Sequence, residues 1–219
     1  MLIAGVDEAG RGPALGPMVL GIATIEKKDE GKLRKLGVKD SKLLSAEERR
    51  RQHAELPKIL REFSFTRIEA KEIDELRDRK SLNEIEAMRI GYLLNNLREK
   101  PDIVYIDSPD PLASNFARRI KKYMSFSTEL RAEHKADMNY LIVGAASVIA
   151  KVERDLEIER LCKKFGKLGS GYPHDPDTIS FLCNWVKKNK KLPEFARKSW
   201  ETSKNIENRV FQKKLAAWK

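Results

Sequence analysis

The chain has 219 residues, 41% hydrophobic and 35% charged, which is typical of a globular protein and excludes a disordered one. A formal net charge of +11 favours an anionic partner such as nucleic acid. No apolar stretch approaches the ~20 residues of a membrane span, and no signal peptide precedes the first apolar segment. We therefore expect a soluble, cytoplasmic protein that does not bind membranes.

Most of the excess charge lies at the end of the chain. Residues 187–219 contain 11 basic and 3 acidic residues, a net charge of +8, so residues 1–186 carry only +3. We therefore divide the chain into a main domain, 1–186, and a basic helical extension, 187–219. The two cysteines, Cys162 and Cys183, form no CxxC pair and are interpreted as partly buried free thiols.

The first half of the chain has the pattern of paired strands followed by helices. Apolar runs at 1–9 and 18–26 predict two strands, joined as an antiparallel pair by a loop rich in glycine and proline. A polar stretch then leads to a capping box at Ser45, which predicts a helix extending to about residue 61. Alternating residues at 63–70 predict a third strand.

In the second half, strands and helices alternate. A second capping box at Ser81 begins a helix, and a buried-type strand follows that stops at Asp107. A short helix is expected at 112–122 and a strand at 126–133. Further helices are predicted over 136–161 as one long helix, 177–188 and 204–218. This order predicts an α/β fold, a mixed sheet flanked by helices with a small C-terminal helical element.

Four acidic residues occupy positions that suggest a shared site. Asp7 and Glu8 follow an apolar strand, Asp107 ends the most hydrophobic strand, and Asp137 begins the long helix. In open α/β sheets, sites form beyond the strand ends, so these side chains can converge. Converging carboxylates repel one another, and hard oxygen ligands suit Mg²⁺ or Mn²⁺. Two such ions about 3.5–4 Å apart would clamp the attacking and leaving oxygens of a phosphodiester.

Structural alternatives exist for these acids. Asp137 suits a helix N-cap, and Asp107, in Asp-Ser-Pro, is typical of a turn, whereas Asp7 has no obvious cap role. Strand alternation points Glu8 away from the face of Asp7. Glu8 therefore reaches a metal only if the strand bulges, or if its carbonyl or a bound water takes part, and the sequence leaves these routes open.

Glycines and a lysine near the acids are further candidates. The segment "GRGPALG" is a poor match to a dinucleotide-binding loop, because it leads into a strand and not a helix. Gly10, Arg11 and Gly12 instead suit a backbone that approaches a ligand closely; the alternative is a simple turn. Lys42, in "KDSK", suits a phosphate contact, or is a solvated surface lysine.

The second half of the chain adds more candidates. Ser147, Lys151 and Arg154 share one face of the long helix and suit phosphate contacts, unless they form the solvated stripe of an amphipathic helix. Tyr172, in "GSGYP", suits stacking on a sugar or base, unless it is a packed turn residue. His134 is either a proton shuttle or a surface histidine.

Five motifs, in chain order, resemble those of ribonuclease HII, the type 2 ribonuclease H, in its archaeal form. They are "GVDEAGRGPALGP", "VKDSKLLS", "YIDSPDP", "HKADMNYLIVGAASVIAKVERD" and "GSGYPHDPDT". The first and fourth together are the most specific, and the resemblance extends over nearly the whole chain. It implies a ribonuclease H-like fold with a mixed five-stranded sheet, in which 1–186 is the catalytic domain.

The resemblance also implies an activity. It is the endonucleolytic hydrolysis of RNA in RNA–DNA hybrids, and at single ribonucleotides within duplex DNA, leaving a 3′-hydroxyl and a 5′-phosphate. The metal carboxylates of the family fall on Asp7, Glu8, Asp107 and Asp137, which implies two Mg²⁺ or Mn²⁺ ions during catalysis. We expect Asp7 and Asp107 to hold the metals most directly.

Substrate contacts follow from the same resemblance. Gly10, Arg11 and Gly12 match the motif that reads the ribose 2′-hydroxyl through backbone contacts, and Tyr172 matches the junction-sensing tyrosine. With the candidates found from the residues, the expected substrate-binding set is Gly10, Arg11, Gly12, Lys42, Ser147, Lys151, Arg154 and Tyr172. The basic extension is expected to grip the duplex backbone.

Two other function classes compete with this interpretation. One is a non-catalytic nucleic-acid-binding module that uses only the basic extension. The other is a related nuclease or transposase of the same fold, which would cut DNA that lacks ribonucleotides. Acids that face phosphates give a pure binder no advantage, so they favour the nuclease. We expect a monomeric enzyme whose partner is an RNA–DNA hybrid or a ribonucleotide-containing duplex.

Overall fold

The computed structural model describes residues 1–38 and 44–216, with side chains described as far as residue 211. The chain forms two compact units. Unit 1 comprises residues 1–9, 19–67 and 81–153, and unit 2 comprises residues 10–18, 68–80 and 154–219. These units differ from the expected segments 1–186 and 187–219, whose boundary falls inside unit 2.

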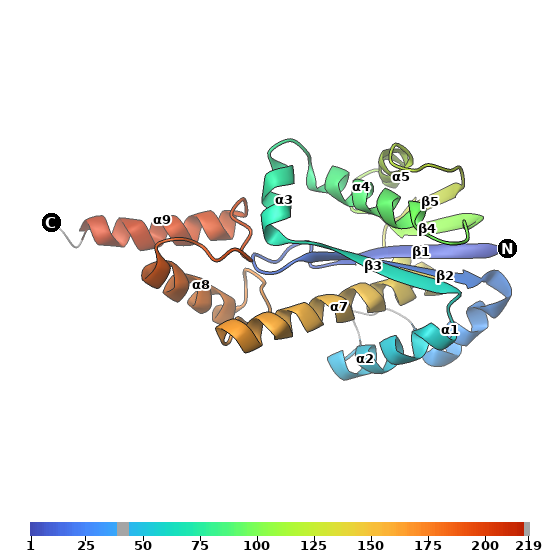
Figure 1. Cartoon of the computed structure of the whole chain (residues 1–219), viewed down its shortest axis with the longest axis horizontal. Coiled ribbons are helices and arrows are strands. Elements are labelled where there is room, and N and C mark those ends of the chain that lie inside the picture. The colour runs from blue at the N-terminus through green and yellow to red at the C-terminus, as the bar shows by residue number, and fades with distance from the viewer. Residues whose placement is uncertain (39–43, 217–219) are drawn as a thin grey trace. The chain divides into compact units, whose positions relative to one another are not determined.

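Unit 1 contains a mixed five-stranded sheet, as expected, with the strand order β3-β2-β1-β4-β5 (Figure 1). The strands are β1 (Leu2–Ala9), β2 (Met18–Glu26), β3 (Glu62–Ile68), β4 (Ile103–Asp107) and β5 (Glu129–Glu133). β1 is antiparallel to β2 and parallel to β4, and β4 is parallel to β5. The central β1 is therefore bordered by a hairpin partner on one side and a crossover partner on the other.

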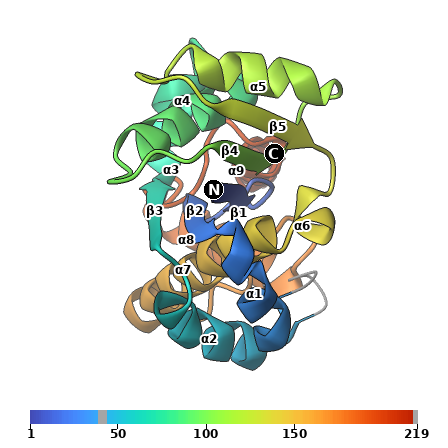
Figure 2. The ribbon, with the colours of Figure 1, turned by 90° about the vertical axis from the view of Figure 1, so that its right-hand side faces the viewer.

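Helices cover both faces of this sheet. Figure 2 shows α4 and α5 on one face, and α1, α2 and the first part of α7 on the other. The helices are α1 (Glu30–Leu36), α2 (Ala46–Glu55), α4 (Leu82–Asn95), α5 (Ala113–Lys121), α6 (Ala136–Asn139) and α7 (Leu141–Phe165), with 3₁₀ turns η1 (Lys27–Asp29) and η2 (Leu56–Lys58). Ser45 and Ser81 cap α2 and α4 as predicted, each accepting a hydrogen bond from the amide three residues on.

Two of the predicted helices differ from the structure, and α3 (Ala70–Arg77) was not predicted. α2 ends at Glu55 rather than near residue 61, and Pro57 lies in the 3₁₀ turn that follows, because proline lacks the amide that an α-helix needs. The prediction of one continuous helix over 136–161 is wrong, since Tyr140 has extended backbone between α6 and α7. Its hydroxyl donates to Glu133 at 2.7 Å and its ring stacks on Tyr105 at 4.1 Å. These side-chain contacts stabilise the break.

Small residues let α7 pack directly on the sheet. A Cβ atom on Gly5 of β1 would lie 2.4 Å from the carbonyl of Ile142, and one on Gly21 of β2 would lie 2.5 Å from the carbonyl oxygen of Ala146. The surrounding core of unit 1 is formed by aliphatic residues of both layers, such as Ile3, Ile25, Leu33, Val143 and Ile149. The close approach of helix and sheet places the α7 side chains beside the end of β1.

Unit 2 is helical and has a core of its own. It contains α3 (Ala70–Arg77), the second part of α7, α8 (Pro176–Asn189) and α9 (Glu201–Ala216). Ala14 and Leu15, from the loop after β1, pack in this core with Ile158 of α7 and Leu182 of α8. The amides of Ala14 and Leu15 both donate to the Gly171 carbonyl. The loop at residues 10–18 thus belongs to the C-terminal core.

None of the helices described in this structure has the length and apolar character that a membrane span requires.

We predict that Gly21→Ala lowers the free energy of unfolding by about 3 kcal/mol, because its Cβ would overlap the α7 backbone, which cannot move aside alone. Gly31→Ala in α1 is the matched control, since a Cβ there meets no atom within 4 Å. It should be neutral or slightly stabilising. Urea denaturation of both variants measures the difference, and equal unfolding midpoints would contradict the packing argument.

Candidate active site

The first candidate residue, Asp7, lies on the central strand and is buried, with 5% of its surface exposed. β1 and β2 pair without interruption from Leu2 to Ala9, including Asp7 opposite Gly21 and Glu8 opposite Leu20. The strand therefore has no bulge at these acids, and alternation puts the Glu8 side chain on the other face. Of the routes open to Glu8, its carbonyl or a bound water remain. The Glu8 amide donates to the Asp7 carboxylate at 2.8 Å.

The other two aspartates lie where β4 and β5 end. Asp107 is the last residue of β4, the parallel neighbour of β1. Its Oδ1 accepts a hydrogen bond from the amide of Ala136, the first residue of α6, at 2.7 Å. Asp137 follows and is also buried, with 3% of its surface exposed. Because the N-cap of α6 is Lys135, Asp137 stands inside the helix and is not its cap.

α7 supplies a hydroxyl and a cation to Asp7. Ser147, which is completely buried, hydrogen-bonds the Asp7 carboxylate, and the amine of Lys151 donates to the Ser147 hydroxyl. Burial raises the pKa of Asp7 to about 6, Lys151 and Ser147 oppose this rise, and the charge of Asp107 adds to it. Two of the predicted phosphate-binding residues thus lie at the carboxylate in this structure.

The donor set fits a hard divalent cation. Asp7 and Asp107 present carboxylate oxygens from neighbouring strands, which suits Mg²⁺ or Mn²⁺ better than Zn²⁺. Among residues 1–38 and 44–216, no three His, Cys, Asp or Glu side chains are grouped closely enough to hold a metal as they stand. The ammonium group of Lys151 contributes positive charge near Asp7 and lowers its pKa.

A second group of candidates lies in unit 2. Gly10 has a φ of +80°, and a Cβ there would lie 2.5 Å from the Arg154 side chain. Gly12 is exposed, and its Cβ position is 3.8 Å from the Tyr172 ring. The Arg154 guanidinium lies 5.2 Å from that ring and donates to the Ser170 carbonyl at 2.9 Å. The structure therefore brings the glycine loop, Arg154 and Tyr172 together.

Two candidates lie elsewhere. Lys42 falls outside the described residues. The two ring nitrogens of His134 face the carbonyl oxygens of Ser108 and Pro111, at 3.2 and 3.3 Å. His134 therefore braces the loop that follows Asp107.

The sequence analysis missed residues that support the site. Asp110, buried three residues after Asp107, accepts a hydrogen bond from Arg119 at 3.0 Å, and Arg119 also donates to Glu84 at 2.8 Å. The second acid of "DSPD" was the available signal. In unit 2, Arg197 is completely buried against the glycine loop. Its position in a basic segment gave no indication of burial.

A mixed five-stranded sheet with carboxylates near the ends of adjacent strands is the arrangement of the ribonuclease H-like nucleases. Residues 4–203 match the family model described as ribonuclease HII, and the chain belongs to this family. It is therefore an enzyme, a metal-dependent endoribonuclease of the ribonuclease H type. Ribonuclease H activity on RNA–DNA hybrids is the activity that this membership implies.

Known relatives match along almost the whole chain. Ribonuclease HII of Pyrococcus horikoshii is 46% identical over 215 residues, which cover 98% of this chain and 97% of that protein. Ribonuclease HII of Methanococcus maripaludis (strain C6) is 44% identical over 220 residues, covering 99% and 92%.

Solved structures agree with the fold. The crystal structure of ribonuclease H2 from P. horikoshii OT3 has a TM-score of 0.91 at 46% identity, covering 97% of this chain and 100% of that one. Ribonuclease HII of Archaeoglobus fulgidus, solved in complex with PCNA, has a TM-score of 0.84 at 40% identity, covering 92% and 96%. Bst-RNase HIII, solved with Mn²⁺, has a TM-score of 0.82 at 20% identity, covering 97% of this chain and 71% of that one. This last likeness shows the fold alone.

We predict that Asp7→Asn stabilises the metal-free chain at pH 7. The pKa of folded Asp7, about 6, exceeds the ordinary 3.8, so the folded state binds the proton more tightly. Its contribution to stability therefore falls as pH rises from about 4 to about 6. The difference of about 2 pKa units corresponds to about 3 kcal/mol at pH 7.

Urea denaturation with a chelator, at pH 4 and pH 7, tests this. The free energy of unfolding of Asp7→Asn should exceed that of the wild type at pH 7, and this difference should be smaller at pH 4. Asp78→Asn, at an exposed position, is the control and should show no such pH-dependent gain. An Asp7→Asn variant that is less stable than the wild type at pH 7 would contradict the burial cost.

Proposed function

We propose that the chain cleaves RNA in RNA–DNA hybrids, and also at single ribonucleotides in duplex DNA, by two-metal-ion hydrolysis that leaves a 3′-hydroxyl and a 5′-phosphate. One observation carries the proposal: Asp7, which is buried, and Asp107, which is partly buried, lie on adjacent strands and interact closely enough that the charge of Asp107 raises the pKa of Asp7. Two such acids are costly in a fold unless a cation binds there.

The four predicted acids would share the metal ions. Asp7 and Asp107 would be direct ligands, Asp137 would complete one ion's shell, and Glu8 would act through its carbonyl or a water, because β1 has no bulge. Two Mg²⁺ or Mn²⁺ ions, when bound, would activate the attacking water and stabilise the departing 3′ oxygen.

Ser147 and Lys151 have a second role in this proposal. In the metal-free chain they hold the charge of Asp7 through a hydrogen bond and through the Lys151 ammonium group. Cations at the carboxylates would replace that interaction. The Lys151 ammonium would then bind a substrate phosphate as a point charge.

Recognition of the ribonucleotide would belong to the loop after β1. Gly10 follows Asp7 by three residues, so the acids and the loop are adjacent in the sequence. Gly12 is exposed and presents its backbone without a side chain. The 2′-hydroxyl is both donor and acceptor and distinguishes RNA from DNA. Tyr172, whose ring lies beside Gly12, would stack on the neighbouring sugar.

Two partners are proposed for this chain, a nucleic-acid duplex because of the basic extension and a PCNA-type protein because of a known relative. The basic extension would bind the duplex backbone, which would make affinity depend on salt. The A. fulgidus relative has been solved with PCNA, which supports a PCNA-type partner for this chain also. A monomeric state and a cytoplasmic location stay predictions.

We predict that Asp7→Asn lowers cleavage of a DNA duplex with one ribonucleotide by at least about 100-fold. Mutating a residue that only hydrogen-bonds a metal ligand already lowers activity about 10–100-fold, and Asp7 is proposed as a ligand itself. Affinity for the duplex should be kept, since Asp7 is buried and repels phosphate. Gel-based cleavage and fluorescence anisotropy measure the two effects. The same duplex without the ribonucleotide is the control and should stay intact with wild-type enzyme; unchanged cleavage by the variant would refute the site.

We predict that Gly12→Ala keeps the fold but lowers kcat/KM at a single ribonucleotide about tenfold. The added Cβ would keep the ribose from approaching the backbone closely, and tenfold is the effect expected for the loss of one backbone hydrogen bond. Its Cβ would make only an ordinary contact with Tyr172, at 3.8 Å. Gly10→Ala is the comparison, and it should instead lower the melting temperature, because of its φ of +80° and the overlap with Arg154. Wild-type kcat/KM in Gly12→Ala would argue against backbone reading of the ribose.

A further inference from the structure

The largest completely buried side chain among the described residues is a cation, Arg197. Its guanidinium donates hydrogen bonds to carbonyls of the glycine loop. Nη2 lies 2.5 Å from the Gly10 carbonyl oxygen, and Nη1 lies 2.8 Å from that of Arg11. Nε and Nη2 also donate to the Gly16 carbonyl, at 3.2 and 3.1 Å. One side chain thus binds both ends of the loop.

Trp200 binds the remaining carbonyl of the motif. Its indole Nε1 donates to the Gly12 carbonyl oxygen at 3.2 Å. The Arg197 guanidinium lies 4.8 Å from the Trp200 ring, and the Arg77 guanidinium of α3 lies 5.8 Å from it. The carbonyls of three consecutive residues, 10 to 12, are therefore all held by the segment at 197–200.

Because the peptide group is planar, fixing the direction of the carbonyls also fixes the direction of the amides. In a trans peptide the N–H points opposite to the C=O of the same unit. Holding the carbonyls of Gly10 and Arg11 toward Arg197 therefore turns the amides of Arg11 and Gly12 to the opposite side. Pro13 has no N–H, so among the three peptide units whose carbonyls are held, the amides of Arg11 and Gly12 are the ones turned away from residues 197–200.

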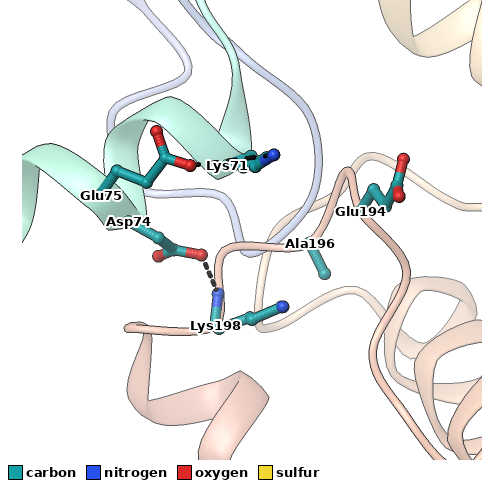
Figure 3. Close-up of a pocket in the computed structure, with 6 residues that line it drawn as sticks. All are labelled: Lys71, Asp74, Glu75, Glu194, Ala196 and Lys198. Carbon is teal, nitrogen blue, oxygen red and sulfur yellow. Dashed lines mark hydrogen bonds and ion pairs between the residues drawn. The ribbon is translucent and has the colours of Figure 1, made fainter.

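The 197–200 segment is itself anchored to α3. The Asp74 carboxylate accepts hydrogen bonds from the amides of Lys198 and Ser199, at 2.7 and 3.0 Å, and from the Ser199 hydroxyl at 2.6 Å. Figure 3 shows Asp74 pointing at the backbone of Lys198, in a groove that Lys71, Glu75 and Glu194 also line. The loop is thus connected to a helix through one short segment.

Burying a guanidinium is costly, and an apolar side chain of similar volume would fill the core of unit 2 more cheaply. Arginine offers five donors in a fixed plane, which can orient several carbonyls at once. An apolar side chain could not hold these carbonyls, so fixing the conformation of the loop is the role that accounts for the cost of burying Arg197.

We propose that Arg197 and Trp200 are positioning residues for ribonucleotide recognition: they fix the carbonyls of Gly10, Arg11 and Gly12 so that the loop amides face the ribose 2′-hydroxyl. This inference rests on the proposed function of the loop. It assigns to the basic C-terminal segment a role in specificity that is separate from its attraction for phosphates.

The test compares two duplexes, one all-DNA and one identical except for a single ribonucleotide. Their Kd values are measured by anisotropy with the full chain and Ca²⁺ as the metal probe, and kcat and KM are measured with Mg²⁺. Trp200→Phe keeps a ring against Arg197 but removes the donor to Gly12, and should reduce the ratio of the two affinities about tenfold. Arg197→Lys keeps the charge but loses the planar fork, and should reduce it at least as much.

Lys198→Met is the matched control, because it removes a cation from the next position, which is exposed. It should weaken both duplexes equally and leave their ratio unchanged. Support requires that Trp200→Phe raises KM for the ribonucleotide duplex, with kcat, all-DNA affinity and melting temperature unchanged. Trp200→Phe decides the question if Arg197→Lys does not fold.

Two results would count against the inference in different ways. If the wild type discriminates between the duplexes and folded Trp200→Phe discriminates equally well, or weakens both duplexes equally, the positioning role is refuted while the proposed function stands. If the wild type itself binds both duplexes equally, the proposed reading of the ribose is refuted, and the positioning role with it.

Discussion

Asp7 is a buried carboxylate on the central strand of the sheet, and much of the surrounding structure follows from the need to accommodate its charge. Burial is the main cause that raises its pKa, to about 6, and the charge of Asp107, which ends the adjacent strand, adds to the rise. Ser147 and Lys151 from α7 offset part of this cost. α7 lies close enough to do so because Gly5 and Gly21 let its backbone contact the sheet. Packing and electrostatics of unit 1 are thus coupled at one residue.

A similar logic applies in unit 2, with the charges reversed. There a buried cation, Arg197, is satisfied by backbone carbonyls instead of by a hydroxyl and an amine. A buried charge is tolerated only when polar groups surround it, so it fixes those groups in place. In unit 1 the fixed groups are side chains suited to metals, and in unit 2 they are peptide units suited to a ligand. In "DEAGRG", the first residue, Asp7, is therefore a buried anion, whereas the last three residues have carbonyls that a segment with a buried cation, Arg197, holds in place.

Both capping boxes, all five strands and the mixed sheet could be predicted from the sequence, because capping and strand alternation are local properties of neighbouring residues. The break at Tyr140 could not, since it depends on a ring stacked on Tyr105 and a hydroxyl bonded to Glu133. Helix propensity alone favours continuing through this position. α3 was missed for a similar reason, since one of its main contacts is to a segment more than 120 residues away.

The sequence by itself determined the family and indicated four candidate acids, because motifs of specific residue types at fixed spacing carry that information locally. It left open how Glu8 could act, and the uninterrupted β1–β2 register removed the bulge from the possibilities. Only the tertiary structure decided that Asp137 is inside α6, that Ser147 and Lys151 meet Asp7, and that Arg197 holds the glycine loop. Each of these depends on contacts between residues far apart in the chain, whose burial and partners no local pattern specifies.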